Sequence, residues 1–267
     1  MKVFIMTDIE GVAGVVSHEQ HSYPTGKYYE DSKKLLTGEV NAAVDGLLAA
    51  GVEKVLVADG HGPGAICFEL LHPKALLLHG RPITRQQLLN PMWEYDAVVM
   101  IGQHARAGTA DGNQSHTQDS LRVDWMELNG HPVGETLQLA LWAGWKGVPV
   151  IFVGGDAAAC REAEEDVPGI TTAVVKWGIG TNCEISRSAQ ASCALINERI
   201  QLAVEKHKAD PVGPIRWEPP YALTIRWLAT HDADNAEHQS DCERVDAKTV
   251  QYRSDNLIDV LCGRHRG

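Results

Sequence analysis

Residues 1–11 read MKVFIMTDIEG, a short apolar run that ends in two carboxylates and a glycine. Residues 3–6 are apolar and partly β-branched, which predicts a buried strand in the middle of a sheet. Asp8 and Glu10 follow two residues apart, so in extended backbone their side chains point to the same side. Such a carboxylate pair is either solvated at the end of an edge strand or needs a cation if it is buried. Divalent metals accept these oxygen ligands.

The composition limits the class of protein. The chain has 267 residues, of which 44% are hydrophobic and 22% are charged, as in ordinary globular proteins. Its formal net charge is -11 and its basic residues form no run, so we expect neither nucleic acid nor a membrane as a partner. The six cysteines are widely spaced, without a C-x-x-C pair. This spacing favours reduced thiols and a cytoplasmic location over a disulfide framework.

Apolar strands alternate with amphipathic helices through most of the chain. Residues 30–50 have apolar side chains at helical spacing, and Gly51 follows them as a C-cap residue would. With the strand predicted over residues 52–59, this helix makes a βαβ unit, whose two strands are parallel. Further strands are predicted over residues 75–79, 95–102, 121–128, 148–154 and 171–177, and further helices over residues 135–146, 157–166 and 186–207. The sequence therefore predicts an α/β fold, with a mostly parallel sheet flanked by helices.

A proline-rich segment, residues 210–220, is the best candidate for a domain boundary. Beyond it we expect a strand over residues 221–229, a polar helical stretch, a strand near residues 249–253 and a last helix near residues 255–262. We therefore predict an α/β domain over residues 1–209 and a smaller C-terminal α+β part over residues 210–267.

Histidines follow two of the predicted strands, in the way that Asp8 and Glu10 follow the first. His61 comes after the strand over residues 52–59, and His104 comes after the strand over residues 95–102. In open parallel sheets the loops at the carboxyl ends of the strands form the ligand crevice, so these four side chains should meet at one rim. A lone histidine there would more often be an ordinary loop residue. Two histidines together with two carboxylates predict a divalent metal site.

Three further residues are candidates for this rim. His116 lies in a long polar loop, residues 109–120, and such loops are often functional. Glu135 either stabilises the start of its helix through the helix dipole or supplies another oxygen ligand. Arg106 either holds a substrate carboxylate or forms a structural ion pair.

These motifs resemble the zinc-dependent D-aminopeptidase family. The resemblance rests on Thr7-Asp-Ile-Glu-Gly11, Ala58-Asp-Gly-His61, Gly102-Gln-His-Ala-Arg106, Ser115-His116 and Pro132-Val-Gly-Glu135. It runs in order from residue 1 to about residue 177, whereas residues 178–185 and 231–241 depart from the pattern. The resemblance implies a large ring-like homo-oligomer, such as a decamer, that admits only short peptides.

The same resemblance implies roles for the site residues. Asp8 would bridge two zinc ions, Glu10, His61, His104 and Glu135 would complete their coordination, and His116 would be the catalytic residue, treated in the family as a nucleophile.

The chemistry of these residues agrees with the resemblance. Three carboxylates and two imidazoles neutralise most of the charge of two divalent ions, and the mixed nitrogen and oxygen set suits zinc, although manganese or cobalt would accept the same ligands. Water activated by such a pair can attack a peptide carbonyl, which favours a role in proton transfer or oxyanion stabilisation over covalent attack for His116.

We therefore predict a dinuclear zinc aminopeptidase that removes the N-terminal residue of short peptides, with a preference for D-amino acids of the D-Ala type. Two alternatives stay open: a metal-dependent amidase or phosphoesterase acting on another small substrate, and a non-enzymatic, metal-dependent binding module.

Overall fold

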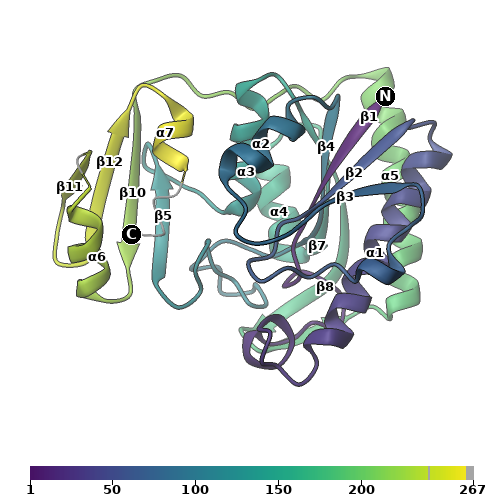
Figure 1. The fold of residues 1–267 in the computed structure, drawn as a ribbon, viewed down its shortest axis with the longest axis horizontal. Helices are drawn as coiled ribbons and strands as arrows, with labels where there is room; N and C mark the ends of the chain where they lie inside the picture. The colour runs from purple at the N-terminus through teal and green to yellow at the C-terminus, as the bar shows by residue number, and fades with distance from the viewer. Residues whose placement is uncertain (240, 263–267) are drawn as a thin grey trace.

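A computed structural model describes residues 1–239 and 241–262, which form two β-sheets with helices packed on them (Figure 1). The larger sheet has seven strands in the order β3-β2-β1-β4-β7-β8-β9. The smaller sheet has five strands in the order β11-β12-β10-β5-β6. The predicted fold class, a mostly parallel sheet flanked by helices with a further α+β part, is confirmed.

The first strand, β1 (Lys2–Thr7), lies in the middle of the larger sheet, as residues 3–6 predict. It pairs in parallel with β2 (Lys54–Asp59) on one side and with β4 (Ala97–Gln103) on the other. The sheet continues through β3 (Ala75–Leu78) beyond β2, and through β7 (Val150–Asp156) and β8 (Thr171–Gly180) beyond β4. Its last strand, β9 (Cys183–Ser186), runs antiparallel to β8. Central parallel strands are covered on both faces, which is why β1 and β4 are almost continuously apolar.

Helices cover both faces of the larger sheet (Figure 1). One face carries α1 (Tyr29–Ala49) and α5 (Ala189–Ala209), which pack on each other, and the other face carries α2 (Arg85–Met92), α3 (Glu135–Trp145) and α4 (Ala157–Asp166). The chain also forms a short π-helical turn, η1 (His18–Ser22), and a short 3-10 turn, η2 (Phe68–Leu70). None of the helices in the described part of the chain is long and apolar enough to cross a membrane.

The smaller sheet is antiparallel and takes its strands from two parts of the chain. Asn129 and Gly130, both at positive φ, form the hairpin turn between β5 (Val123–Leu128) and β6 (His131–Pro132). Strand β5 pairs with β10 (Tyr221–Trp227), which pairs in turn with β12 (Thr249–Ser254), and β11 (Cys242–Arg244) lies at the edge. The helices α6 (Thr230–Glu237) and α7 (Leu257–Leu261) pack on this sheet. The domain division at residue 210 stays a prediction, and residues 263–267 of the predicted C-terminal part lie outside the described residues.

Several predicted elements begin two or three residues later than expected, and the largest shift is in a helix. The helix predicted over residues 186–207 begins at Ala189, because Ser186 belongs to β9 and Ser188 is the N-cap. The Ser188 hydroxyl accepts a hydrogen bond from the backbone N–H of Ala191 at 3.2 Å. Pairing with β8 thus outweighs the local helical pattern of residues 186–188.

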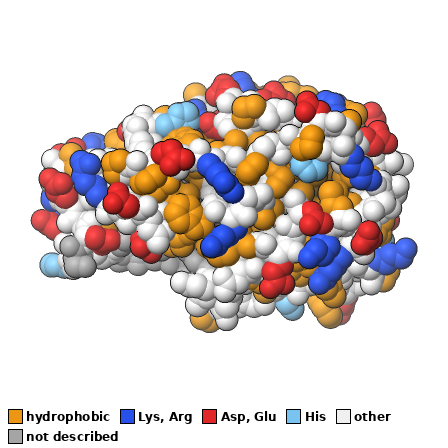
Figure 2. Space-filling view, turned by 90° about the horizontal axis from the view of Figure 1, so that it is seen from above, with side chains coloured by type: hydrophobic (Ala, Val, Ile, Leu, Met, Phe, Trp, Pro, Cys, Tyr) orange, Lys and Arg blue, Asp and Glu red, His pale blue; other side chains and the backbone are white. Residues whose placement is uncertain are grey.

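Acidic and basic side chains are interspersed on the face shown in Figure 2.

The chain reverses its direction across the larger sheet between β1 and β4. From β1 to β3 it moves towards one edge, and from β4 onwards it moves towards the other. At such a reversal the loops that follow the two central strands diverge and leave a crevice at the carboxyl ends. These two loops carry Asp8 and His104.

Candidate metal centre

Two glycines let the loop after β1 pack closely against the end of β4. The backbone N–H of Gly11 donates to the carbonyl oxygen of Gly102 at 2.8 Å. A Cβ atom at Gly11 would lie 1.9 Å from the carbonyl oxygen of Gln103, and one at Gly102 would lie 2.0 Å from that of Asp8. Larger residues would push the loops apart, so these glycines set the approach of Asp8 to His104.

Each carboxylate oxygen of Asp8 faces a different imidazole. Asp8 Oδ1 lies 3.2 Å from His61 Nδ1, and Asp8 Oδ2 lies 3.3 Å from His104 Nε2. Glu10 Oε2 lies 3.3 Å from the same nitrogen of His61, and Glu135 Oε1 lies 3.5 Å from the same nitrogen of His104. Asp8 therefore belongs to two clusters of donor atoms, one with Glu10 and His61 and the other with His104 and Glu135. All five predicted metal-ligand candidates lie together.

Backbone carbonyls fix the orientation of the three imidazoles. Each ring donates one N–H to a carbonyl oxygen: His61 to Ser22 at 2.8 Å, His104 to Ala105 at 3.0 Å, and His116 to Gln114 at 2.8 Å. A carbonyl oxygen only accepts hydrogen bonds, so the ring nitrogen that faces it carries the proton. The opposite nitrogen faces an ionised carboxylate, which also only accepts. That contact needs either a second ring proton or a cation.

The buried charges shift the pKa values of these groups. Burial raises the pKa of Asp8, but the adjacent imidazoles of His104 and His61 outweigh burial and hold that pKa well below its usual value. Burial alone would lower the pKa of His61 and of His104. The carboxylates of Glu10 and Asp8 outweigh burial at His61, and those of Asp8 and Glu135 outweigh it at His104. Both pKa values are therefore raised well above the usual one. Without a metal, Asp8 and Glu135 are therefore ionised and His61 and His104 are protonated, and a bound metal would displace those ring protons.

Some of these donor atoms lack the hydrogen-bond partners that buried polar atoms usually have. Within the described part of the chain, Glu10 Oε2 and His104 Nε2 are buried without a hydrogen-bond partner. Buried polar atoms of this kind are rare unless an ion or another ligand satisfies them. One ligand atom each from Asp8, Glu10 and His104 lie within 4.8 Å of one another, as do atoms from His104, His116 and Glu135. This set of oxygen and imidazole donors suits zinc.

His116 lies at the edge of the second cluster. Its ring stacks on that of His104, with centroids 3.9 Å apart and planes inclined by 12°. Because the Nδ1–H group is donated to Gln114, Nε2 is the nitrogen that faces the cluster, 3.8 Å from Glu135 Oε1. Nε2 is therefore the ring nitrogen that could exchange a proton with a ligand bound at this cluster.

His18, which the sequence did not single out, also borders the clusters. Its Nδ1 atom lies 4.0 Å from Glu10 Oε1, and its ring packs edge-on against that of His116 with centroids 5.1 Å apart. Among the described residues this Nδ1 is buried without a hydrogen-bond partner. Burial and the neighbouring His116 and His104 lower the pKa of His18 to about 3, so its imidazole is neutral. His18 lies in η1 rather than at the end of a strand, so the pattern of strand ends in the sequence does not point to it.

A buried lysine holds the loop that carries Glu10. Lys176 Nζ donates to the carbonyl oxygen of Glu10, to that of Val15 at 2.7 Å and to Asn113 Oδ1 at 2.8 Å. It also pairs with Glu184 Oε2 at 3.0 Å, and the two side chains are only 0% and 3% exposed. The one sequence signal for this role is a charged residue inside the otherwise uncharged strand predicted over residues 171–177.

Arg106 lies beside the site but is engaged elsewhere. Its Nη1 atom lies 3.7 Å from Glu162 Oε1, and its backbone N–H donates to Glu162 Oε2 at 3.0 Å. These contacts favour the structural ion pair over a contact with a substrate carboxylate.

Comparisons with known proteins extend over nearly the whole chain. A family model described as D-aminopeptidase matches residues 1–263. A D-aminopeptidase of Bacillus subtilis (strain 168) is 30% identical over 265 residues, which cover 97% of this chain and 94% of the relative. A similar solved structure is that of the Zn-dependent D-aminopeptidase DppA from Bacillus subtilis, a self-compartmentalizing protease. Its TM-score is 0.91 at 28% identity, over 98% of this chain and 94% of that chain. The chain therefore belongs to the D-aminopeptidase family and is a metallo-aminopeptidase, a hydrolase of peptide bonds.

Proposed function

We propose that the chain is a dinuclear zinc aminopeptidase that removes the N-terminal residue of short peptides, with a preference for D-amino acids of the D-Ala type. One observation carries this proposal. The two oxygens of Asp8 lie 3.2 and 3.3 Å from ring nitrogens of two histidines, each of which is bound through its other nitrogen to a backbone carbonyl. Each of these contacts is satisfied either by a second ring proton or by a cation, and the proposal places a cation on each side of Asp8.

We propose ligands for both ions from the two clusters. Asp8, Glu10 and His61 would hold one zinc ion, and Asp8, His104 and Glu135 would hold the other, with Asp8 as the bridge. When bound, zinc lowers the pKa of a water molecule and polarises the peptide carbonyl. The carbonyl oxygens of Ser22 and Ala105 orient the two imidazoles and keep their ring protons on the far side.

His116 is proposed to move the proton during hydrolysis. With its Nδ1–H donated to Gln114, Nε2 is free to accept a proton from the attacking water and to return it to the departing amine. Glu135 Oε1, at 3.8 Å, would stabilise the imidazolium that forms in between. This arrangement favours proton transfer over covalent attack by His116.

The test is turnover against metal content. The protein is stripped with a chelator, zinc is added back in steps, and hydrolysis is followed on a D-Ala dipeptide, the L-Ala dipeptide, an acyl amide and p-nitrophenyl phosphate. We expect turnover of the D-Ala dipeptide to rise with zinc up to two ions per chain. Asp8→Asn keeps the shape of the side chain and should abolish both zinc binding and turnover, whereas Asp31→Asn, on the exposed side of α1, should change neither.

Other outcomes identify the alternatives. Preferred turnover of the amide or the phosphate ester would replace the aminopeptidase with the corresponding hydrolase. Stable zinc binding without turnover of any substrate would indicate a metal-dependent binding module.

We further propose that the chain forms a cytoplasmic homo-oligomer, with a decameric ring as the arrangement implied by the family resemblance. DppA is described as self-compartmentalizing, which supports assembly. The hairpin of β8 and β9 exposes Trp177, Ile179 and Ile185, apolar side chains that a subunit contact would bury. Light scattering should give a mass of several subunits, and Ile179→Ser combined with Ile185→Ser should lower it. A monomeric mass for the unmodified protein would contradict the proposal.

A further inference from the structure

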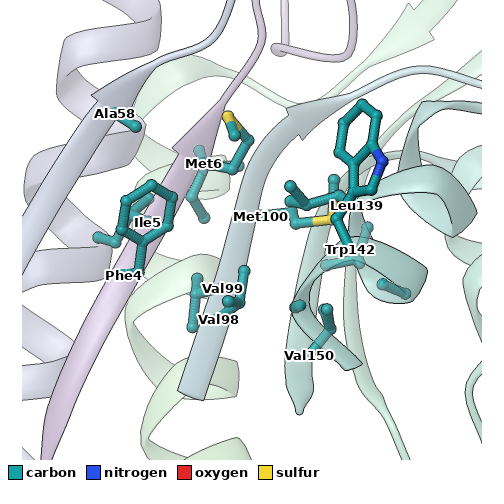
Figure 3. Close-up of a cluster of buried hydrophobic side chains, with 14 of the residues drawn as sticks. Phe4, Ile5, Met6, Ala58, Val98, Val99, Met100, Leu139, Trp142 and Val150 are labelled. Carbon is teal, nitrogen blue, oxygen red and sulfur yellow. The ribbon is translucent and has the colours of Figure 1, made fainter. Parts of the chain in front are cut away.

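The loop that carries His61 has little side-chain packing of its own. Residues 59–64 read DGHGPG, so a glycine lies on each side of His61. Glycine lacks a Cβ atom and leaves the backbone many conformations. Packing in the core holds β2 up to Ala58, which is fully buried and lies in the apolar cluster of Figure 3. Beyond that point the direction of the His61 ring depends on support from outside the loop.

Arg81 supplies contacts to three backbone carbonyls of this loop. Its Nη2 atom donates to the carbonyl oxygen of Asp59 at 2.9 Å and to that of His61, and its Nε atom donates to that of Gly62. Arg81 lies shortly beyond the end of β3, the strand that pairs with β2. Because the N–H groups of a guanidinium form a rigid, planar fork, these bonds fix the directions of the three carbonyl groups relative to one another.

The carboxylate of Asp59 supports a different part of the loop. Its two oxygens accept hydrogen bonds from the backbone N–H of Ala65 at 2.9 and 3.0 Å. The Oδ1 atom lies 3.9 Å from Arg81 Nη2, which is too far for a hydrogen bond. Asp59 therefore closes the loop from within, whereas Arg81 holds the backbone of His61 from outside.

We infer that Arg81 is a positioning residue for the proposed zinc ion held by Asp8, Glu10 and His61. The inference rests on the proposed function, which assigns His61 to that ion. The ring of His61 is oriented by the carbonyl oxygen of Ser22, and its Nδ1 atom faces Asp8 Oδ1 at 3.2 Å. Arg81 holds the backbone of the same residue, so both ends of His61 are fixed. The effect of Arg81 on zinc is thus transmitted through His61.

Zinc binding to the metal-free protein tests the inference. Isothermal titration calorimetry on the chelator-stripped protein should show two binding steps. In Arg81→Met, which has no donor groups, we expect one step to weaken about 10- to 100-fold, as when a residue that supports a metal ligand is removed. The step assigned to His104 and Glu135 should stay unchanged. Arg81→Lys keeps the charge but lacks the planar fork, so its affinity should be intermediate.

A double substitution tests whether the effect passes through His61. In His61→Ala the ion that depends on this ring is already weakened, so adding Arg81→Met should cause no further loss of zinc affinity. Two residues that act independently would instead show additive losses.

Arg199→Met is the matched control. Arg199 Nε also donates to a backbone carbonyl, that of Thr172 at 2.9 Å, but Thr172 lies at the start of β8, at the opposite end of the strands from the site. This variant should leave both zinc-binding steps unchanged. Hydrogen exchange of the metal-free proteins gives a second measurement. Residues 59–66 should exchange faster in Arg81→Met than in the unmodified protein, and at an unchanged rate in Arg199→Met.

The outcomes separate this inference from the proposed function. Equal weakening of both zinc-binding steps, or a further loss when Arg81→Met is added to His61→Ala, overturns the positioning role. Unchanged zinc binding in Arg81→Met overturns it as well. If the unmodified protein binds two zinc ions but hydrolyses no peptide, the proposed function fails, while a selective loss of one binding step in Arg81→Met still supports the inference. Absence of zinc binding by the unmodified protein overturns both.

Discussion

Replacing Lys176 with methionine removes the ammonium group that ties β8 to the loop of Glu10. The Nζ atom has four partners: the carbonyl oxygens of Glu10 and Val15, Asn113 Oδ1, and Glu184 Oε2 at 3.0 Å. Methionine has a similar length but cannot donate a hydrogen bond. In Lys176→Met the three oxygen acceptors and the Glu184 carboxylate therefore stay buried without this donor.

The expected loss of stability follows from the burial of the ion pair. Breaking a buried pair by removing one partner costs about 3–5 kcal/mol, because the remaining charge is left uncompensated. Glu184 is only 3% exposed, so this range applies. A domain has a total stability of about 5–15 kcal/mol, so we expect Lys176→Met to fold with a clearly reduced free energy of unfolding.

Two assays follow the consequences of this substitution. Urea unfolding monitored by tryptophan fluorescence gives the change in the free energy of unfolding. Isothermal titration calorimetry gives the zinc affinity, which we expect to decrease about 10- to 100-fold, as when a residue that supports a metal ligand is removed. The reason is that the loop of Glu10 loses its buried anchor.

Two further variants serve as controls. Lys34→Met breaks a surface pair with Asp31 in which both side chains are mostly exposed, and we expect no measurable change in either assay. Lys176→Met combined with Glu184→Gln should be less destabilised than Lys176→Met alone, because no uncompensated charge stays buried. If Lys176→Met unfolds at the same urea concentration as Lys34→Met and binds zinc equally well, the role assigned to Lys176 is wrong.

Three more predictions concern single side chains. Burial raises the pKa of Glu39 to about 7 from 4.5, so the folded state holds a proton that the unfolded state releases, and stability falls as the pH rises through this window. Glu39→Gln should remove that loss and gain about 3 kcal/mol near pH 8 in urea titrations, and an unchanged pH profile would count against it. His116→Ala should retain zinc by elemental analysis while kcat falls about 100- to 10,000-fold, and unchanged turnover would exclude its catalytic role. His18→Ala should weaken zinc binding about 10-fold in calorimetry, because the His18 ring packs between Glu10 and His116. His21→Ala, in the same turn, should leave the zinc affinity unchanged. Equal zinc affinities of the two variants would show that His18 does not belong to the site.

The sequence predicts those parts of the site that depend on strand ends. Asp8, His61 and His104 each lie one or two residues beyond an apolar strand, and parallel strands that are neighbours end at the same edge of a sheet. Glu135 begins a helix that follows a hairpin of the other sheet, so its position depends on how the two sheets are joined. Periodicity alone leaves that open, and only the resemblance to the family assigned this residue to the site.

Contacts between distant segments could not be predicted in the same way. The pairing of β5 with β10 joins segments that are far apart in the chain, and the alternation of side chains in each strand is compatible with several partners. Lys176 lies 166 residues from Glu10, and a lone lysine in a strand more often faces solvent than a buried carbonyl. His18 lies in an irregular turn, where no strand or helix periodicity in the sequence marks it as a residue of the site.

The bridging role of Asp8 is tested most directly by anomalous diffraction at the zinc edge on crystals of the purified protein. We predict two peaks, one about 2.0–2.2 Å from atoms of Asp8, Glu10 and His61 and the other at the same distance from atoms of Asp8, His104 and Glu135. A single peak in active protein, or two peaks of which one lies away from Asp8, would contradict it.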